Sequence, residues 1–153
     1  YKNIELYLIS PKALQMPDYL VELLKNSNHK VIVSDELEKN IAHVDIVYST
    51  RIQEERFGSQ EEADLYRGKF RLNQSVYTKF CEPNTVIMHP LPRDSRSEAN
   101  ELDSDLNENP NLAIFRQADN GVVVRMSLFA LVLDVVSEID KYSRTVSWYI
   151  GNR

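Results

Sequence analysis

Short apolar runs separated by amphipathic stretches characterise the N-terminal part of the chain. Four runs rich in branched and aromatic residues have the length of β-strands, and they are Ile4–Ile9, Lys30–Val33, Asp45–Tyr48 and Val86–Met88. Strands that alternate with helices are typical of parallel sheets joined by right-handed crossovers. The pattern therefore predicts an α/β fold, a Rossmann-like three-layer domain whose parallel sheet is flanked by helices.

Apolar residues at three- and four-residue spacing predict the helices between these strands. The first helix opens after Ser10 and carries Pro17 in its first turns, where a missing backbone donor is tolerated. Further apolar spacing of this kind occurs at Leu37, Ile41 and Val44, over Asn73–Phe80, and from Val122 to about Ile139, the last after a turn at Ala118–Gly121.

Two polar segments are too long to be ordinary connections. They extend from Ser49 to about Gly68 and from Arg93 to Pro110. Loops of this length in compact domains are often lids or binding loops. The chain ends in a tail, Tyr142–Arg153, whose apolar residues are expected to dock on the core or on a missing domain. These residues are Val146, Trp148, Tyr149 and Ile150.

A chain of 153 residues is the size of one domain and can bury a single core. Its formal charge of -5, from 18 basic and 23 acidic residues, argues against nucleic acid or an anionic membrane as the partner. Small molecules or other proteins are the expected partners. Because the sequence begins at Tyr1 and runs almost at once into a strand, we expect it to be a piece of a longer protein.

Cys81 is the only cysteine, which excludes an internal disulfide and a zinc site made of several thiolates. A reducing, cytoplasmic setting is therefore predicted. No apolar run approaches the ~20 residues of a membrane helix, and the N-terminus lacks the basic-then-apolar layout of a signal peptide.

Common ligand motifs are missing from the sequence. Glycine occurs at only 4 positions, which is too few for a dinucleotide or phosphate loop. Asp103–Asn107 opens like a calcium loop, but the sixth position is Glu108 and the twelfth is Ile114, so an EF-hand is rejected. The histidines have no metal-binding spacing and are interpreted as structural or surface residues, so no metal site is predicted. They are His29, His43 and His89.

Two strand exits carry unusual residues at the edge where parallel α/β sheets bind ligands. After the third strand, Arg51 and Gln53 point the same way in an extended chain, so a guanidinium fork and an amide converge. This pair suits a carboxylate, because Arg can bind both oxygens while Gln donates to one of them. The alternative is that both are ordinary surface residues of a loop.

The second exit is the stretch Thr85–Arg93, where two prolines follow a buried strand. Pro90 and Pro92 fix φ and remove two backbone donors, which favours extended geometry at Leu91. The carbonyls of Pro90 and Leu91 are then held rigidly and can face a ligand. The alternative is a rigid turn that binds nothing.

Three motifs occur in register along the chain, namely Asp45–Arg56, Met88–Arg93, and Phe115–Gly121 with Val124–Leu128. Together they resemble the C-terminal half of aspartate carbamoyltransferase. The resemblance implies that residues 1–153 are a single aspartate-binding domain. The whole enzyme would transfer the carbamoyl group of carbamoyl phosphate to L-aspartate, giving N-carbamoyl-L-aspartate and phosphate in de novo pyrimidine biosynthesis.

The resemblance also assigns roles at the two strand exits. Arg51 and Gln53 match positions that grip the carboxylate oxygens of aspartate. The carbonyls of Pro90 and Leu91 match those that orient the carbamoyl amide and the attacking amine, and Pro92 completes the rigid loop. Catalysis in the family comes from orientation and from charge stabilisation, and no cofactor is implied.

Further implied roles depend on parts of the enzyme that this chain does not contain. Arg125 matches an arginine that lines the site, and Arg56 matches an interdomain residue that holds the enzyme closed. The carbamoyl phosphate site and the catalytic histidine, which is not His89, belong to an N-terminal domain. The family suggests a homotrimer whose active sites are shared between subunits. We therefore expect this chain alone to be inactive.

The sequence departs from the family after Arg93, and this departure leaves alternatives open. Many members continue Val-Asp-Glu-Ile, whereas this chain has a longer loop in which Asp94 is the nearest acidic partner for Arg56. A catalytically inactive paralogue with an assembly or regulatory role is one alternative. Another is a carbamoyltransferase for a different acceptor such as ornithine, although the cation of ornithine would be repelled by Arg51.

Overall fold

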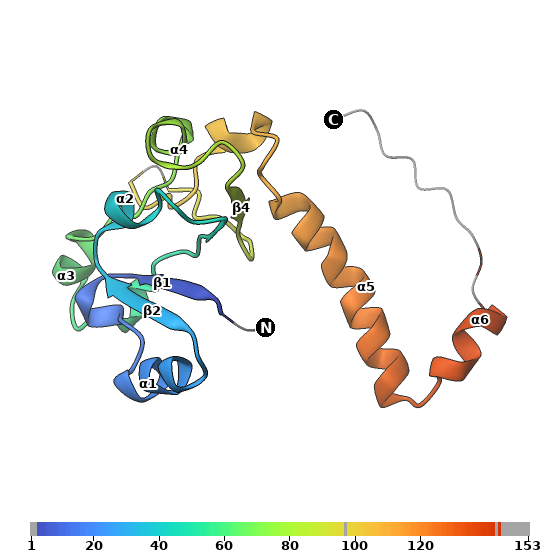
Figure 1. Cartoon of the computed structure of the whole chain (residues 1–153). Helices are drawn as coiled ribbons and strands as arrows, with labels where there is room; N and C mark the ends of the chain where they lie inside the picture. The colour runs from blue at the N-terminus through green and yellow to red at the C-terminus, as the bar shows by residue number, and fades with distance from the viewer. Residues whose placement is uncertain (1–2, 97, 143, 145–153) are drawn as a thin grey trace. The chain divides into compact units, whose positions relative to one another are not determined.

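A computed structural model describes residues 3–96, 98–142 and 144. It divides the chain into two compact units, Tyr1–Phe115 and Arg116–Arg153. The strands are β1 (Glu5–Ile9), β2 (Lys30–Ser34), β3 (Ile46–Tyr48) and β4 (Val86–Met88) (Figure 1). The α-helices are α1 (Asp18–Asn26), α2 (Leu37–Asn40), α3 (Gln60–Asp64), α4 (Gln74–Phe80), α5 (Ile114–Val132) and α6 (Ile139–Tyr142). Short 3-10 turns are η1 (Lys12–Leu14), η2 (Glu54–Arg56), η3 (Ser104–Glu108) and η4 (Val136–Glu138).

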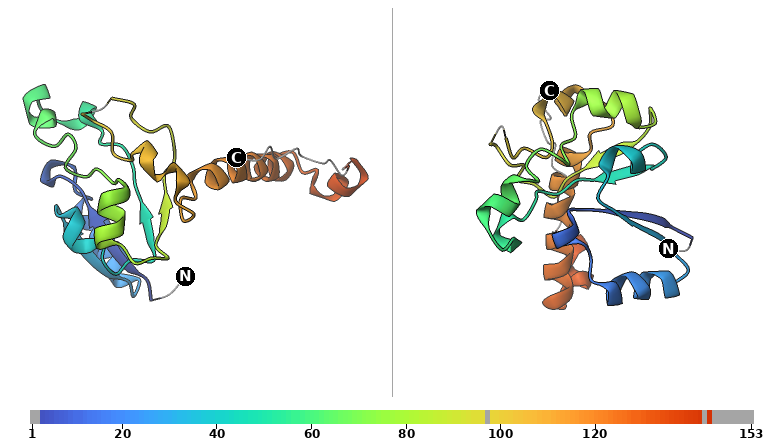
Figure 2. Two further views of the ribbon diagram at one scale, coloured as in Figure 1. Left: turned by 90° about the horizontal axis from the view of Figure 1, so that it is seen from above. Right: turned by 90° about the vertical axis from the view of Figure 1, so that its left-hand side faces the viewer.

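The four strands form two parallel pairs. In the first pair Leu6 lies opposite Val31, and in the second Val47 lies opposite Ile87. Helix α1 lies against β2, while α2 contacts both β1 and α4 (Figure 2). Parallel strands flanked by helices are thus confirmed, but the strands do not form one sheet among the described residues. A groove of about 1380 Å³, lined by residues of β1 and β3, separates the two pairs.

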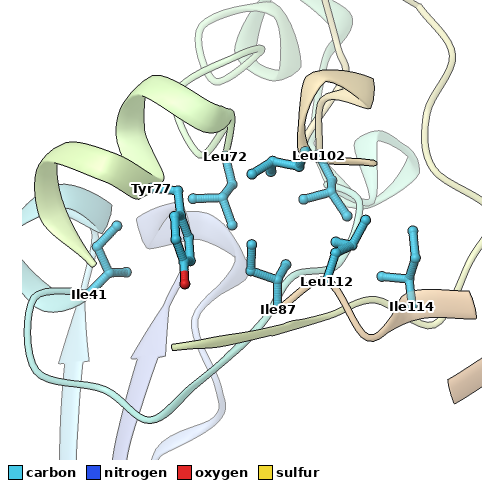
Figure 3. Close-up of a cluster of buried hydrophobic side chains, with 8 residues drawn as sticks. Ile41, Leu72, Tyr77, Ile87, Leu102, Leu112 and Ile114 are labelled. Carbon is cyan, nitrogen blue, oxygen red and sulfur yellow. The ribbon is translucent and has the colours of Figure 1, made fainter. Parts of the chain in front are cut away.

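The core of the first unit surrounds β4, whose Ile87 is fully buried. The other large members of this cluster come from α4, α5, the C-cap of α2 and the polar connections, and the labelled ones are Ile41, Leu72, Tyr77, Leu102, Leu112 and Ile114 (Figure 3). The Tyr77 hydroxyl donates to the Thr85 carbonyl at 2.9 Å, so α4 is fixed to the start of β4. Burial of these side chains therefore determines where β4 ends and where the residues after it lie.

Helix α1 begins later than its apolar spacing predicts. Pro17 is the N-cap with a ψ of 140°, and Lys12–Leu14 form a separate 3-10 turn. The prediction of one helix with Pro17 inside its first turns was therefore wrong. The residue before a proline is pushed toward extended geometry, so Met16 breaks the helical run.

Helix α5 passes through the predicted turn at Ala118–Gly121 and ends before Ile139, so both predicted boundaries were wrong. The helix ends because Asp134 adopts a left-handed φ of 55°. The Val135 amide donates to the Ala130 carbonyl at 2.9 Å and the Asp134 amide to the Leu131 carbonyl at 3.2 Å. These two bonds form a Schellman motif, which satisfies carbonyls at the end of a helix.

Apolar side chains of α5 are largely exposed within the second unit. Those that are more than half exposed are Val122, Val123, Val124, Met126, Leu128, Phe129, Leu131 and Val132. Among the residues that the structure describes, no helix combines the length and the apolar character needed to cross a membrane. The predicted docking residues of the tail, from Val146 to Ile150, lie outside the described residues.

Candidate active site

The two unusual strand exits lie side by side because β3 and β4 are parallel neighbours. Tyr48 and Met88, the last residues of the two strands, are register partners. The pairing continues one step further, since the Ser49 amide donates to the Met88 carbonyl at 2.9 Å. Segments that are far apart in the sequence therefore leave the same edge of the strand pair together.

A cavity of about 510 Å³ opens at this edge. Six residues that the sequence singled out line it, and they are Arg51, Gln53, Arg56, Pro90, Leu91 and Pro92. Arg125 belongs to the second unit, where its side chain lies over Gly121 of α5 and a Cβ at Gly121 would lie 3.4 Å from its Nη1 atom. The role of Arg125 therefore stays a prediction.

The loop after β4 is held in place by a buried pair of side chains, His89 and Glu101. The His89 side chain is 1% exposed and the Glu101 side chain 3%, and His89 Nε2 lies 2.7 Å from Glu101 Oε1. The Leu91 amide donates to His89 Nδ1 at 2.9 Å. Because Nδ1 accepts that bond, Nε2 carries a hydrogen and donates it to Glu101. The Asp94 amide also donates to Glu101, at 3.2 Å, so one carboxylate holds both ends of the loop.

The environment of Glu101 favours its charged form. Burial raises the pKa of the Glu101 carboxyl, but hydrogen bonds from His89 and from the backbone amides of Glu101 and Asp94 outweigh burial. The pKa therefore lies below its ordinary value. A charged acceptor makes stronger hydrogen bonds than a neutral one, which strengthens the support of the loop.

The loop itself differs from the predicted extended geometry at one residue. Leu91 has a left-handed φ of 56°, so the prediction for Leu91 was wrong, and the Leu91–Pro92 peptide is cis. The hydrogen bond from the Leu91 amide to His89 accompanies this turn. In the described part of the chain, neither the Pro90 nor the Leu91 carbonyl accepts a hydrogen bond, so both oxygens can bind a ligand.

The segment after β3 is held by charges nearer the surface. Arg51 Nη2 donates to Glu55 Oε1 at 2.7 Å, and the two side chains are 46% and 56% exposed. The pKa of the Glu55 carboxyl lies below its ordinary value because its own backbone amide donates to it and Arg51 lies beside it. Arg51 is thus paired with Glu55, and its half-exposed guanidinium still lines the cavity.

The acidic partner expected for Arg56 pairs with another residue. Asp94 Oδ2 accepts from Arg96 Nη2 at 2.6 Å, and Asp94 Oδ1 accepts from the Arg96 amide at 2.9 Å. These bonds lower the pKa of Asp94 to about 2. Asp94, which the sequence suggested as the acidic partner of Arg56, is therefore bonded to Arg96 of its own loop in this structure.

Comparison with known proteins decides the family. Residues 1–132 match the family described as "Aspartate/ornithine carbamoyltransferase, Asp/Orn binding domain". The chain belongs to this carbamoyltransferase family. Over its full length it is 70% identical to the aspartate carbamoyltransferase catalytic subunit of Cellvibrio japonicus, of which it covers 45%. The chain thus spans less than half the length of this relative.

Solved structures of the carbamoyltransferase family share the fold. The catalytic subunit of M. jannaschii aspartate transcarbamoylase has a TM-score of 0.73 at 32% identity, over 88% of this chain and 42% of that one. Aspartate transcarbamoylase from Trypanosoma cruzi, solved with N-(phosphonacetyl)-L-aspartic acid, has a TM-score of 0.69 at 25% identity, over 82% of this chain and 39% of that one.

Sequence reasoning missed two residues that support the segments around the cavity, Glu101 and Arg96. Glu101 and Arg96 both lie in the long polar segment after Arg93, where no periodicity separates a buried charge from a solvated one. The only local signal was the position of Glu101 directly before the apolar Leu102. The structure shows that both residues are buried. The contact between Glu101 and His89 spans 12 residues and depends on the fold.

Proposed function

We propose that this chain is the aspartate-binding domain of an enzyme that transfers the carbamoyl group of carbamoyl phosphate to L-aspartate. The observation that supports this most strongly is the shared cavity, in which a cationic fork and two carbonyl-bearing residues meet from separate strand exits. The family match covers aspartate and ornithine enzymes, so the choice between acceptors depends on the residues of the cavity.

Arg51 and Gln53 favour a dicarboxylate acceptor. A guanidinium binds both oxygens of one carboxylate, and an amide adds one further donor. The ammonium group on the side chain of ornithine would instead lie near a like charge, which costs several kcal/mol at a binding site. We therefore assign the acceptor as aspartate.

Pro90 and Leu91 are proposed to orient the reacting groups. Their carbonyl oxygens would accept hydrogen bonds from the carbamoyl amide and from the α-amino group of aspartate. The amine nitrogen then forms a bond to the carbamoyl carbon, the bond from that carbon to the phosphate oxygen breaks, and the amine loses a proton. Pro92 limits motion of the loop, so much of the orientation is present before the substrates bind.

The remaining parts of the active site are proposed to come from outside this chain. The chain covers 45% of its Cellvibrio relative, which leaves length for an N-terminal carbamoyl phosphate domain. The exposed apolar side chains of α5 are consistent with cover by further protein. Arg56 and Arg125 are proposed to act in domain closure and in the site. The family resemblance supports a homotrimer, and a cytoplasmic location stays a prediction.

The proposed function can be tested by assaying the full-length protein with carbamoyl phosphate and either L-aspartate or L-ornithine. We expect carbamoyl aspartate and phosphate in equal amounts, with ornithine used at least roughly a hundredfold less efficiently. Residues 1–153 alone should show no turnover. Preference for ornithine would overturn the choice of acceptor, and failure to use either would support an inactive paralogue.

A further inference from the structure

An ion-pair network links the two segments that line the cavity. Glu54 directly follows Gln53 on the β3 side, and Asp94 directly follows Arg93 on the β4 side. Arg96 lies between the two carboxylates. Its Nη2 atom donates to Asp94 Oδ2 at 2.6 Å and to Glu54 Oε1 at 3.1 Å, while its Nη1 atom donates to Glu54 Oε2 at 3.2 Å.

Glu54 also forms hydrogen bonds with a second arginine, Arg67. Arg67 Nε and Nη2 donate to its two oxygens, each at 3.0 Å, and Arg67 Nη1 lies 2.9 Å from Asp64 Oδ1 of α3. Two guanidinium forks on one carboxylate fix its direction as well as its position. The side chains of Glu54 and Asp94 are only 16% and 13% exposed, so water screens these bonds less than those of a fully exposed pair.

The network compensates for weak anchoring of the β3-side segment. This segment, defined as residues 49–59 after β3, contains the 3-10 turn η2, and its Arg51–Glu55 pair is about half exposed. Exposed pairs contribute little to holding a segment in place. By contrast, Glu54 joins the same segment to the β4-side loop through Arg96. Arg96 does not line the cavity, so it acts through the residues that it holds.

We propose that Arg96 is a positioning residue that sets the spacing between the Arg51–Gln53 segment and the Pro90–Pro92 loop, and thereby sets the affinity for the acceptor. This inference rests on the proposed function. Arg96 belongs to the longer loop that replaces the Val-Asp-Glu-Ile expected after Arg93. Acceptor affinity in this protein thus depends on a residue of the loop in which its sequence departs from the family.

The inference is tested in the full-length protein by measuring kcat and both KM values for Arg96→Ala, Arg96→Lys and Glu54→Gln. Arg96→Ala should raise the KM for aspartate by about three- to tenfold, because a partly exposed charged contact is lost. The KM for carbamoyl phosphate should change less than twofold. Arg96→Lys, which keeps the charge but loses the fork, should fall between the wild type and Arg96→Ala. The Arg96→Ala/Glu54→Gln double variant should be no worse than the worse single variant.

Arg71→Ala is the matched control. Arg71 donates to both oxygens of Asp103 at 2.7 Å, and these side chains are 40% and 12% exposed, much like those of Arg96 and Glu54. Neither residue lines the cavity. Arg71→Ala should lower the Tm as Arg96→Ala does, with an unchanged KM for aspartate.

The outcomes separate this inference from the proposed function. If the wild type is active and Arg96→Ala leaves the KM for aspartate unchanged, this inference is overturned and the proposed function stands. An equal rise in KM for Arg71→Ala also overturns it, since any loss of stability would then have the same effect. A wild type that does not use aspartate overturns the proposed function and this inference together.

Discussion

The segments after β3 and β4 line one cavity, but they are held in different ways. The β4-side loop is held by the buried pair of His89 and Glu101, whose side chains are almost fully enclosed. The β3-side segment is held by ion pairs that are more exposed than the pair of His89 and Glu101, namely those of Glu55 with Arg51 and of Glu54 with Arg67. Buried hydrogen-bonded groups have few alternative arrangements, whereas surface ion pairs are screened and exchange partners more easily.

This difference suggests a division of tasks between the two segments. The carbonyls of Pro90 and Leu91 must orient reacting atoms, and orientation is sensitive to small displacements. In the proposed function, Arg51 and Gln53 bind carboxylate oxygens of the acceptor. This binding tolerates more movement than the orientation of the reacting atoms does. We therefore expect substitutions beneath the β4-side loop to reduce stability and kcat, and substitutions around the β3-side segment to raise the KM for aspartate.

The largest effect on stability is expected for Glu101→Ala. The change leaves the buried His89 Nε2 and the Asp94 amide without their acceptor, which should lower the free energy of unfolding by roughly 3 kcal/mol. Urea unfolding of the full-length protein checks this. Glu108→Ala is the control, because Glu108 is an exposed carboxylate of the same polar segment and should change stability by less than about 0.5 kcal/mol. Equal effects of the two changes would contradict the role of the buried pair.

The second-largest effect on stability is expected from acid, which should break the ion pairs of Glu54. Hydrogen bonds from Arg67 and Arg96 lower the pKa of Glu54 from 4.5 to about 2, so its ion pairs stabilise the folded state above pH 4.5 and are lost as the pH falls toward 2. The contribution should be about 1–2 kcal/mol, below the full linkage value because Arg96 is partly exposed. Unfolding measured from pH 6 to pH 2 should show a smaller loss for Glu54→Gln than for the wild type. Identical losses would show that Glu54 does not contribute.

The smallest effect is expected at the far end of the β3-side segment. Ser59 is the N-cap of α3, and its hydroxyl accepts from the Glu62 amide at 3.2 Å. Ser59→Ala should cost about 1 kcal/mol, seen as faster hydrogen exchange in α3, while Ser59→Asp restores the cap. The KM for aspartate should change less than twofold, because Arg67 and Arg96 still hold Glu54. A larger rise would mean that the cap, rather than the ion pairs, positions this segment.

Local sequence patterns located the strands and the strand exits well. The apolar run at 86–88 is β4 with the predicted bounds, and the helix expected over Asn73–Phe80 forms with Asn73 as its N-cap. Both depend on neighbouring residues only. Because parallel strands end at one edge, the strand assignment placed both unusual exits at the edge that binds ligands, and the structure brings Arg51 and Leu91 to one cavity there.

What sequence reasoning missed has more than one physical cause. Asn120 and Gly121 favour a turn locally, yet they lie within the 19-residue helix α5, because the propensity cost of about 1 kcal/mol for a glycine does not by itself end a helix. Leu91 was expected to be extended, but its amide bonds to His89 and its φ is left-handed. Glu101 and Arg96 gave no periodic signal, since a charge in an irregular segment shows its partner only once the chain is folded.

The central claim is that the Arg51 guanidinium binds the acceptor in the cavity that it shares with the Pro90–Pro92 loop. The most direct test is the KM for aspartate of the full-length Arg51→Ala variant, compared with that of the Arg71→Ala control. Loss of a charged hydrogen-bond partner costs ~1.5–3 kcal/mol, so the KM should rise roughly tenfold to over a hundredfold, with the KM for carbamoyl phosphate nearly unchanged. A KM for aspartate equal to that of the control would contradict the claim and remove Arg51 from the site.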